Sequence, residues 1–302
     1  MRGFRKSMPE KAFAVFNIIF MVVLCALTLY PFIYVMAYSL NEGADATQGG
    51  IYFFPRKFTL FNYQYVLTNG TMQSAYVITI GRTLLGTTLG LFVTGVTAYG
   101  ASFRNLPGRK YIMFYILIPM LFSGGLVPYY IQLSKLHLIN SFWVFVIPGM
   151  FNIWNMFVLM KFFMGIPESL RESAIIDGAN EMVVLWKIIV PVAAPAIAAI
   201  ALFTAVGHWN DWFTGAFFVN NIKLIPVQTY LQRLLMADSL GTITGNQEGN
   251  TEAIFRASQS SNMTLKALKT AAVIVGTLPV LFVYPFLQRY FVKGVLVGSI
   301  KG

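Results

Sequence analysis

The first apolar run of the chain is long enough to require a membrane. No residue from Ala12 to Asn41 carries a charge, whereas about 20 apolar residues already span the hydrocarbon core of a bilayer and a signal-peptide core is shorter still. Basic residues precede the run, namely Arg2, Arg5, Lys6 and Lys11. We therefore predict a membrane helix over 12–41 behind a cytosolic tail, residues 1–11, and no cleavable signal peptide.

The composition extends this conclusion to the whole chain. Of its 302 residues, 57% are hydrophobic and only 11% are charged, whereas soluble domains carry about 25% charged residues. The net charge of +11 does not predict a nucleic-acid partner, because the basic residues lie at the ends of apolar runs, as membrane flanks do. We expect a multi-pass protein of the cell membrane, in contact with lipid.

Cysteine and histidine are too scarce for a metal site. Cys25 is the single cysteine, which excludes an internal disulfide and a multi-cysteine site. His137 and His208 are the two histidines, and no cluster of ligating residues accompanies them. The sequence therefore predicts neither a bound metal nor a catalytic residue.

Five further apolar runs divide the rest of the chain. They predict membrane helices over 82–103, 111–134, 136–160, 191–212 and 268–288, with a short surface helix near 58–63. Residues 12–288 thus form a transmembrane domain with an inner loop over 161–190 and an outer loop over 221–262, and residues 289–302 form a tail. Proline and glycine interrupt the runs at 111–134 and 136–160, which favours the interior of the bundle over lipid contact.

Charge decides the orientation. Six helices place both termini on one side of the membrane, and with the termini inside, the inner segments hold more than half of the 22 basic residues. The predicted fold is therefore an all-α integral membrane protein with six transmembrane helices and both termini cytoplasmic.

The most charged segment, residues 167–191, lies on the cytosolic side in this topology. Pro167 suits the first position of a helix, and Glu168 suits its first turn. Gly178 is expected to end this helix of about three turns with a positive φ angle. A second amphipathic piece follows, with apolar residues at helical spacing, namely Met182, Leu185, Trp186 and Ile189. An ordered charged hairpin is typical of a surface that a soluble partner binds, although an ordinary cytosolic connector would need no partner.

The same segment resembles the EAA loop of ABC importer permeases. The matching residues are Glu172, Ser173, Ala174, Gly178, Ile188 and Pro191. Every spacing agrees, with Ser173 where the family usually has alanine and Val190 where it usually has leucine. The resemblance implies that Glu172 bonds to a basic residue of a partner ATPase, that Ser173 and Ala174 allow close docking, and that Gly178 makes the turn.

Other segments resemble the carbohydrate branch of these permeases, close to the maltose-type subunit and its oligosaccharide subgroup. They are 122–128, Trp209-Asn210-Asp211, 288–294 and 298–302. The resemblance implies a second homologous permease subunit, a cytosolic ATPase dimer that uses ATP, and an extracytoplasmic sugar-binding protein. It implies no cofactor bound by this chain and no enzyme activity, and the sequence contains no Gly-x4-Gly-Lys-Ser/Thr phosphate loop.

Two opposite charges are predicted at similar depth near the outer face. At 1.5 Å per residue, Arg82 lies roughly 33 Å from the inner flank at Arg104, and Asp211 lies roughly 30 Å beyond Pro191. Arg82 could extend to the headgroups by itself, and Asp211 could simply end its helix there. We predict instead that the two side chains come within pairing reach. The candidate pathway or gate residues are Arg82, Trp209, Asn210, Asp211 and Trp212.

The two tryptophans of this group have two interpretations, because Trp209 and Trp212 could stack on sugar rings or serve as interfacial anchors.

Two other classes of membrane protein are alternatives to a permease. A secondary transporter needs ion-coupling carboxylates within the membrane or inverted repeats, and a membrane enzyme needs convergent nucleophile and base residues. The sequence favours neither, because its inner carboxylates gather in the hairpin. Co-purification of ATPase subunits distinguishes the permease from both.

Overall fold

The computed structural model describes residues 8–236 and 264–299, with side chains as far as residue 282. Its regular structure is helical, apart from an isolated antiparallel bridge between Asn41 and Phe58. The chain forms two compact units, one of residues 1–69 and 234–276 and the other of residues 70–233 and 277–302. The predicted outer loop, 221–262, lies mostly outside the described residues, and its described beginning holds η3 (Ile222–Leu224) and α13 (Val227–Met236).

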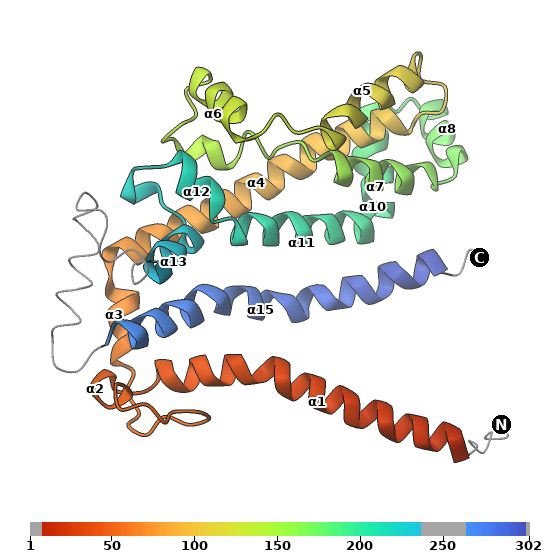
Figure 1. Ribbon diagram of the computed structural model, residues 1–302. Helices are drawn as coiled ribbons and strands as arrows, with labels where there is room; N and C mark the ends of the chain where they lie inside the picture. The colour runs from red at the N-terminus through yellow and green to blue at the C-terminus, as the bar shows by residue number, and fades with distance from the viewer. Residues whose placement is uncertain (1–7, 237–263, 300–302) are drawn as a thin grey trace. The chain divides into compact units, whose positions relative to one another are not determined.

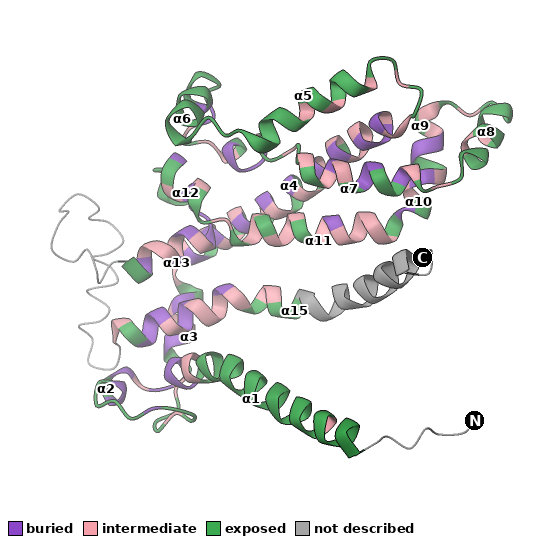
Figure 2. Ribbon diagram, turned by 45° about the vertical axis from the view of Figure 1, so that its right-hand side comes forward, coloured by how far each residue is buried: buried purple, intermediate pink, exposed green. Residues whose placement is uncertain are grey.

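The first unit begins with α1 (Met8–Ser39), which confirms the helix predicted over 12–41 to within a few residues. Its apolar side chains are exposed along most of its length (Figure 2), as expected for a helix in contact with lipid or with another membrane helix. Only its end packs inside the unit, where Ala37 and Tyr38 contact Ala46, Ile51 and Ala267.

Hydrogen bonds fix the loop that follows α1. Asp45, in α2 (Gly43–Ala46), accepts bonds from Asn41 Nδ2 and Arg56 Nε, both at 3.0 Å. The Asn41 amide, with Arg56 beside it, holds the pKa of the Asp45 carboxyl below its usual value. The ionised carboxylate therefore stabilises the loop at neutral pH, and this contribution is lost as the pH falls through the lowered pKa. The predicted surface helix is α3 (Phe61–Thr68), a few residues later than expected.

The second unit is built around α4 (Gly70–Ser102), which packs against α7 (Ile153–Met164) and α11 (Ala194–Asn210), as Figure 1 shows. The predicted end at residue 103 is confirmed, but the predicted start at Arg82 is wrong by twelve residues. The sequence predicts a boundary at Arg82 because a charge normally ends a membrane span. Its side chain is instead fully buried within the unit, so the helix continues past it.

Small residues recur along the buried face of α4. Gly86, Gly90, Thr94 and Ala98 recur at four-residue intervals and are all buried. Membrane helices approach closely where such residues meet, because lipid tails give apolar helices no hydrophobic reason to associate. The C-terminal half of this face joins the main core cluster, together with Met156 and other residues of α7 and of the helices that lead into α11.

The single membrane helix predicted over 111–134, with proline and glycine interrupting it, is two helices in the structure. The chain forms α5 (Arg109–Leu121) and α6 (Leu126–Lys135), which are bent by 112° relative to each other. Gly125 adopts a φ of 83° at the break, a conformation that glycine accepts without strain. The expected burial is also wrong, since α5 has no buried residue.

The prediction of a helix over 136–160 is confirmed only in its second half. His137 and Asn140 have left-handed backbone angles, with φ of 53° and 59°, which end any helix there. The 3-10 turn η1 (Phe142–Phe145) and an irregular segment over 146–152 precede α7. α7 is well buried through Met156, Leu159, Met160 and Phe163, as expected for a helix of the bundle interior.

The last two predicted helices are longer than expected, and the first of them is bent. The helix predicted over 191–212 begins at α9 (Glu181–Val184) and continues through the π-helix η2 (Leu185–Ile189) and α10 (Val190–Val192). It then bends by 84° into α11. The helix predicted over 268–288 is α15 (Leu265–Ser299), which includes Pro279 and extends through most of the predicted tail.

In the described part of the chain, three helices are long and apolar enough to cross a membrane, namely α1, α4 and the segment 265–282 of α15. Two bent pairs, α5 with α6 and α9–α10 with α11, raise this to five if each pair is one span. α7 is apolar but shorter. The protein is thus an all-helical membrane protein with three to five candidate spans.

Gly215 provides a test of the packing at the other end of this unit, where α12 (Phe213–Phe218) meets α13. A β-carbon at Gly215 would lie 2.9 Å from Pro226 Cδ and 3.1 Å from Thr229 Cβ. Because the proline ring is rigid, we expect Gly215→Ala to destabilise the protein by about 1–3 kcal/mol and to lower its thermal-unfolding midpoint in detergent. Gly95→Ala is the matched control, since nothing lies within 4 Å of a β-carbon there. An unchanged midpoint for Gly215→Ala would contradict this packing.

Candidate functional site

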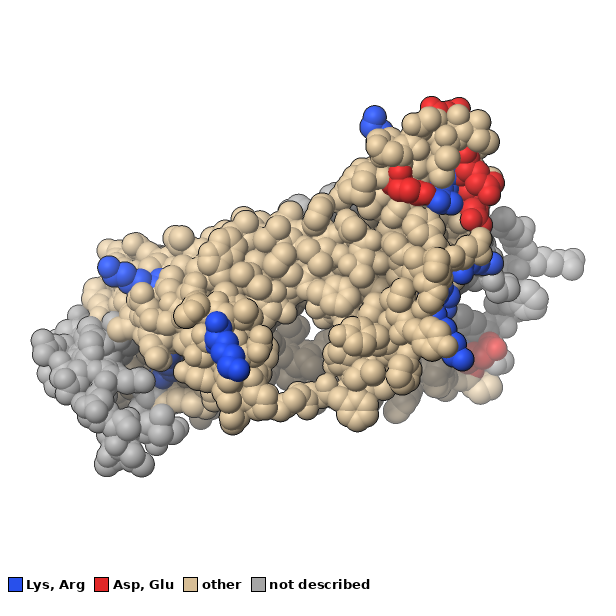
Figure 3. All heavy atoms as spheres, turned by 90° about the horizontal axis from the view of Figure 1, so that it is seen from above, with Lys and Arg blue, Asp and Glu red and all other residues tan. Residues whose placement is uncertain are grey.

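The charged hairpin begins with α8 (Glu168–Ile176). Pro167 is the residue just before the helix, with φ −56° and ψ 130°, and not its first helical residue as predicted. The acidic side chains visible in Figure 3 gather mostly at the end of the unit that carries α8. Helix α8 has no buried residue, so its outer surface is open to a partner.

The turn after α8 confirms the positive φ angle predicted for Gly178. Its φ is 85°, and its N–H donates to the Ile175 carbonyl at 3.0 Å. The Ala179 N–H donates to the Ala174 carbonyl at 2.9 Å. These two bonds form a Schellman motif, in which a residue with positive φ satisfies the last carbonyls of a helix. Any residue with a side chain is strained at this position.

The motif residues of α8 divide between two faces. Glu172 and Ser173 are exposed, but Ala174 is half-buried and packs with Ala179 against the core cluster. The sequence analysis missed Ile176, whose side chain is 84% exposed at the tip of the hairpin. A large apolar residue beside the turn of a charged helix is the signal that could have revealed it.

The second half of the hairpin connects α8 with the membrane helices. Leu185 and Ile189 are buried as predicted, whereas Met182 and Trp186 remain about half exposed, at 49% and 43%. The motif residue Ile188 packs against the core cluster. Pro191 is exposed and lies in α10, directly before the 84° bend into α11.

A polar cluster joins the hairpin to the C-terminal end of α4. The guanidinium of Arg171 pairs with the Glu181 carboxylate through Nε and Nη2, and its Nε lies 3.1 Å from Oε1. The Tyr99 hydroxyl donates to Glu181 Oε2 at 2.6 Å. The same guanidinium lies over the ring of Phe103, 4.6 Å from its centroid. We call these four residues the inner clamp. Sequence reasoning missed it because its members come from three separate elements.

The predicted pair of opposite charges is present. Arg82 Nη1 lies 3.4 Å from Asp211 Oδ2, and Arg82 Nη2 donates to the Asp211 carbonyl at 2.5 Å. The guanidinium also lies 5.1 Å from the centroid of the Phe145 ring. The side chain of Arg82 is fully buried, so the alternative in which it extends alone to the headgroups is wrong. Asp211 Oδ1 accepts a further bond from the Thr214 N–H at 3.1 Å, at the start of α12.

The neighbouring motif residues differ in their surroundings. The Trp209 ring lies 6.4 Å from the ring of Tyr76 on α4, so it packs inside the unit. Trp212 is 40% exposed, and its carbonyl accepts a bond from the Thr229 hydroxyl at 2.8 Å. Asn210 is exposed, with its amide bonded to the Val206 carbonyl. Trp212 and Asn210 are therefore more accessible to a ligand than Trp209.

Similar proteins are found among known sequences and solved structures. Residues 10–297 match the protein family described as "Binding-protein-dependent transport system inner membrane component". Protein LplC of Bacillus subtilis (strain 168) is 36% identical over 292 residues, which cover 97% of this chain and 96% of LplC.

The polygalacturonan/rhamnogalacturonan transport system permease protein YtcP of Bacillus subtilis (strain 168) is 34% identical over 283 residues, which cover 94% of this chain and 96% of YtcP. A chain in the crystal structure of a bacterial ABC transporter involved in the import of the acidic polysaccharide alginate has a TM-score of 0.86 and 28% identity. That match covers 96% of this chain and 100% of the other.

The buried pair gives a stability prediction. Asp211→Asn keeps an oxygen for the Thr214 N–H but leaves the buried guanidinium without its counter-charge, so we expect a loss of about 1–3 kcal/mol, measured as a lower thermal-unfolding midpoint in detergent. Adding Arg82→Met should recover part of this loss, because the unpaired charge is then removed. Asp177→Asn, at an exposed carboxylate, is the control and should change little. Equal effects of the two aspartate substitutions would argue against the pair.

Proposed function

The chain belongs to the binding-protein-dependent transport system inner membrane components, and on this basis we propose that it is the permease subunit of an ABC importer that moves oligosaccharides into the cytoplasm. It is a transport subunit of the plasma membrane and not an enzyme, and ATP is used by partner subunits. The observation that carries the proposal is the exposed helix α8, which ends in a Schellman turn and is fixed to α4 by the inner clamp.

The proposed topology has six membrane spans with both termini in the cytoplasm. The bent pair α5–α6 and the pair α9–α11 each count as one span, and α7 with the irregular segment before it completes the six. The long helices α1 and α15 supply the first and the last. The transmembrane domain is then residues 12–288, with the coupling loop 161–190 inside, the outer loop 221–262 outside, and the tails 1–11 and 289–302 in the cytoplasm. The distribution of basic residues supports this orientation.

The proposed complex contains a second homologous permease subunit, a cytosolic ATPase dimer and an extracytoplasmic sugar-binding protein. Dependence on a binding protein is part of the description of the family. The second permease and the ATPase dimer follow from the resemblance of the hairpin to the EAA loop. Exposed apolar helices such as α1 and α5 leave ample surface for another membrane subunit or for lipid.

The hairpin is the proposed contact with the ATPase. Glu172 would bond to a basic residue of the ATPase, while Ser173 allows close approach and Ile176 supplies an apolar contact. Ala174 and Gly178 shape the turn, and Ile188 and Pro191 connect it to the bend before α11. When the ATPase closes on ATP and moves α8, the inner clamp transmits the motion directly to α4, because Arg171 and Tyr99 share the carboxylate of Glu181.

The outer gate is the second part of the proposed mechanism. The Arg82–Asp211 pair joins α4 to the junction between α11 and α12, so a movement of α4 relative to α11 changes the position of Trp209, Asn210 and Trp212. An oligosaccharide substrate fits the transport system named for YtcP and the alginate importer, and tryptophan and amide side chains commonly contact sugars.

The coupling role is tested at Gly178. We expect Gly178→Leu to leave the chain in the membrane but to lower oligosaccharide uptake at least tenfold, because a left-handed conformation costs a branched residue about 1–2 kcal/mol and the turn must rearrange. Gly49→Leu is the matched control, since Gly49 has a similar φ of 71° and open space around it but lies in the outer loop. Normal uptake with normal ATPase association in Gly178→Leu would reject the proposed role of the hairpin.

The topology is tested with single cysteines in a Cys25→Ser background. An impermeant thiol reagent added to intact cells should label Lys223→Cys, which is exposed in η3, and should not label Ser173→Cys. Both positions should be labelled after the cells are made permeable. Labelling of Ser173→Cys from outside would overturn the orientation. The corresponding outer position at Gln247 lies outside the described residues.

A further inference from the structure

The loop between α2 and α3 exposes a run of aromatic side chains. Tyr52, Phe53 and Phe54 are 59%, 57% and 83% exposed, and no charged residue lies between Asp45 and Arg56. Soluble surfaces rarely expose large apolar residues in such a group, whereas membrane proteins place aromatic residues at both interfaces of the bilayer. We call Tyr52, Phe53 and Phe54 the aromatic tip.

Hydrogen bonds fix the base of this loop at the end of α1. The Glu42 N–H donates to the Lys57 carbonyl at 2.9 Å. The Thr59 N–H donates to the Leu40 carbonyl at 2.8 Å. These bonds hold the two ends of the loop side by side directly after Ser39, the last residue of α1. The residues between them therefore start and finish at a defined position.

The aromatic tip lies back along α1. In Figure 1 the loop after α2 runs back beside the end of this helix. The ring of Phe53 lies 5.5 Å from the ring of Tyr30 in an edge-to-face arrangement. Tyr30 precedes Ser39 by roughly 14 Å of helix. The chain reverses at Gly49 and Gly50, whose φ angles of 71° and 74° suit glycine. The tip thus lies well below the base of its own loop.

The length of α1 places the tip at the border of the hydrocarbon core. The apolar run of α1 begins after Lys11, and the core of a bilayer is about 30 Å thick. Tyr30 lies roughly 28 Å beyond Lys11 along the helix. The ring of Phe53, beside Tyr30, therefore lies where aromatic residues gather in membrane proteins, and the base of the loop lies farther out among the headgroups.

The charges at the base of the loop are paired. Arg56 Nε lies 3.0 Å from Asp45 Oδ2. Lys57 Nζ lies 3.7 Å from Glu42 Oε2. Because each base has an acid beside it, these residues carry no net charge together. Attraction to anionic lipids is therefore not what brings the loop to the membrane, and the apolar surface of the tip must supply the affinity.

We infer that the aromatic tip inserts into the outer interface of the lipid bilayer and anchors the end of α1 at a fixed depth. The tip continues the exposed apolar surface of α1, which a lipid bilayer covers. A soluble partner would approach from the aqueous side and meet the charged base first. This anchoring is additional to transport, and only the assignment to the outer side rests on the topology proposed above.

The test measures depth with nitroxide labels on single cysteines in the assembled importer, with Cys25→Ser as background and nanodiscs of phosphatidylcholine. Phe54→Cys reports on the tip. Ala44→Cys is the matched control, because Ala44 is exposed in α2 near the base. Val23→Cys, exposed in the apolar part of α1, calibrates the hydrocarbon core. Depth follows from collisions with oxygen, which concentrates in lipid, relative to collisions with a nickel chelate, which stays in water.

We expect the label at Phe54 to lie roughly 10 Å deeper than the label at Ala44, and less deep than the label at Val23. Its depth should be the same when anionic lipid is added. Equal depths for Phe54 and Ala44 would place the tip in water and overturn the anchor. Insertion only in the presence of anionic lipid would overturn it as well, because charge and not the aromatic rings would then supply the affinity.

A second measurement removes the tip itself. In the double variant Phe53→Ser with Phe54→Ser, a label at Met36→Cys, exposed near the end of α1, should become several-fold more accessible to the nickel chelate. Leu60→Ser is the matched control, since Leu60 is similarly exposed but follows the base of the loop. Equal accessibility in the double variant and the parent would show that the tip anchors nothing.

The same labels distinguish lipid from a protein partner. A label at Phe54 that is immobile and shielded from both reagents would show that another subunit covers the tip. A label that becomes immobile only when the sugar-binding protein is added would identify a docking surface for that protein. Either result would overturn the anchor and leave the importer function intact. Absence of oligosaccharide uptake by the wild type would contradict the proposed function without changing the depth of any label.

Discussion

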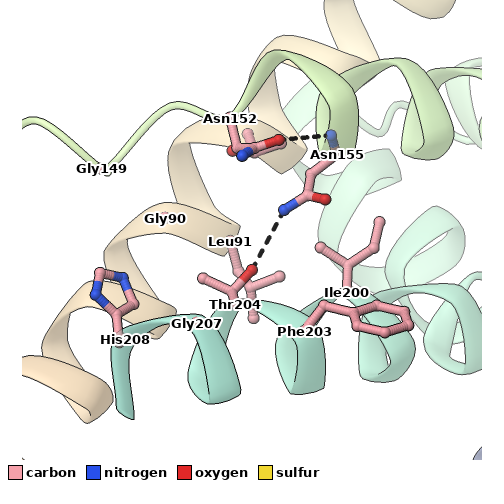
Figure 4. A pocket seen from close by; sticks show the side chains of 11 residues that line it. Gly90, Leu91, Gly149, Asn152, Asn155, Ile200, Phe203, Thr204, Gly207 and His208 are labelled. Carbon is pink, nitrogen blue, oxygen red and sulfur yellow. Dashed lines mark hydrogen bonds between the residues drawn. The ribbon is translucent and has the colours of Figure 1, made fainter. Parts of the chain in front are cut away.

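The packing of α4 against α7 and α11 is the contact on which the functional features of the second unit depend. Small residues recur along the buried face of α4, so the backbones can meet closely. Lipid gives apolar helices no hydrophobic reason to associate, which makes this close packing important. Three features follow along this one helix. Arg82 pairs with Asp211, and Tyr99 belongs to the inner clamp. Between them, Gly90 borders a polar cavity of about 290 Å³ that Asn152, Asn155 and Thr204 also line (Figure 4). A shift of α4 therefore reaches all three together.

Local chemistry explains what could be predicted from the sequence. The hairpin was predictable because Gly178 and its neighbours determine the turn by themselves, through backbone conformation and helix capping. The Arg82–Asp211 pair was predictable from helical rise alone, since two independent depth estimates agreed. The family motif added the partner surface but not Ile176, because the motif does not include that position.

Nonlocal packing explains what could not be predicted. An uncharged apolar run looks the same whether it forms one straight span or two helices at 112°. The bend after Leu121 was therefore not predicted, although proline and glycine interrupt the run, and neither was the irregular segment before α7. Arg82 was read as the end of a span because its counter-charge lies far away in the sequence. The inner clamp and the polar cavity depend on residues from several elements, and neither shows any spacing that a single sequence can reveal.

The inner clamp has a consequence for where the protein can bend. Arg171 bonds to the Glu181 carboxylate, to which Tyr99 also donates, and its guanidinium lies over the ring of Phe103. Helix α8 is therefore fixed to both α4 and α9. We expect a displacement of α8 to move α4 and α9 with it, because the inner clamp restricts bending within the hairpin. We expect bending to occur instead at the 84° bend at Ala193. There the regular hydrogen bonding of the helix is already weakened by a π-helical turn and by Pro191.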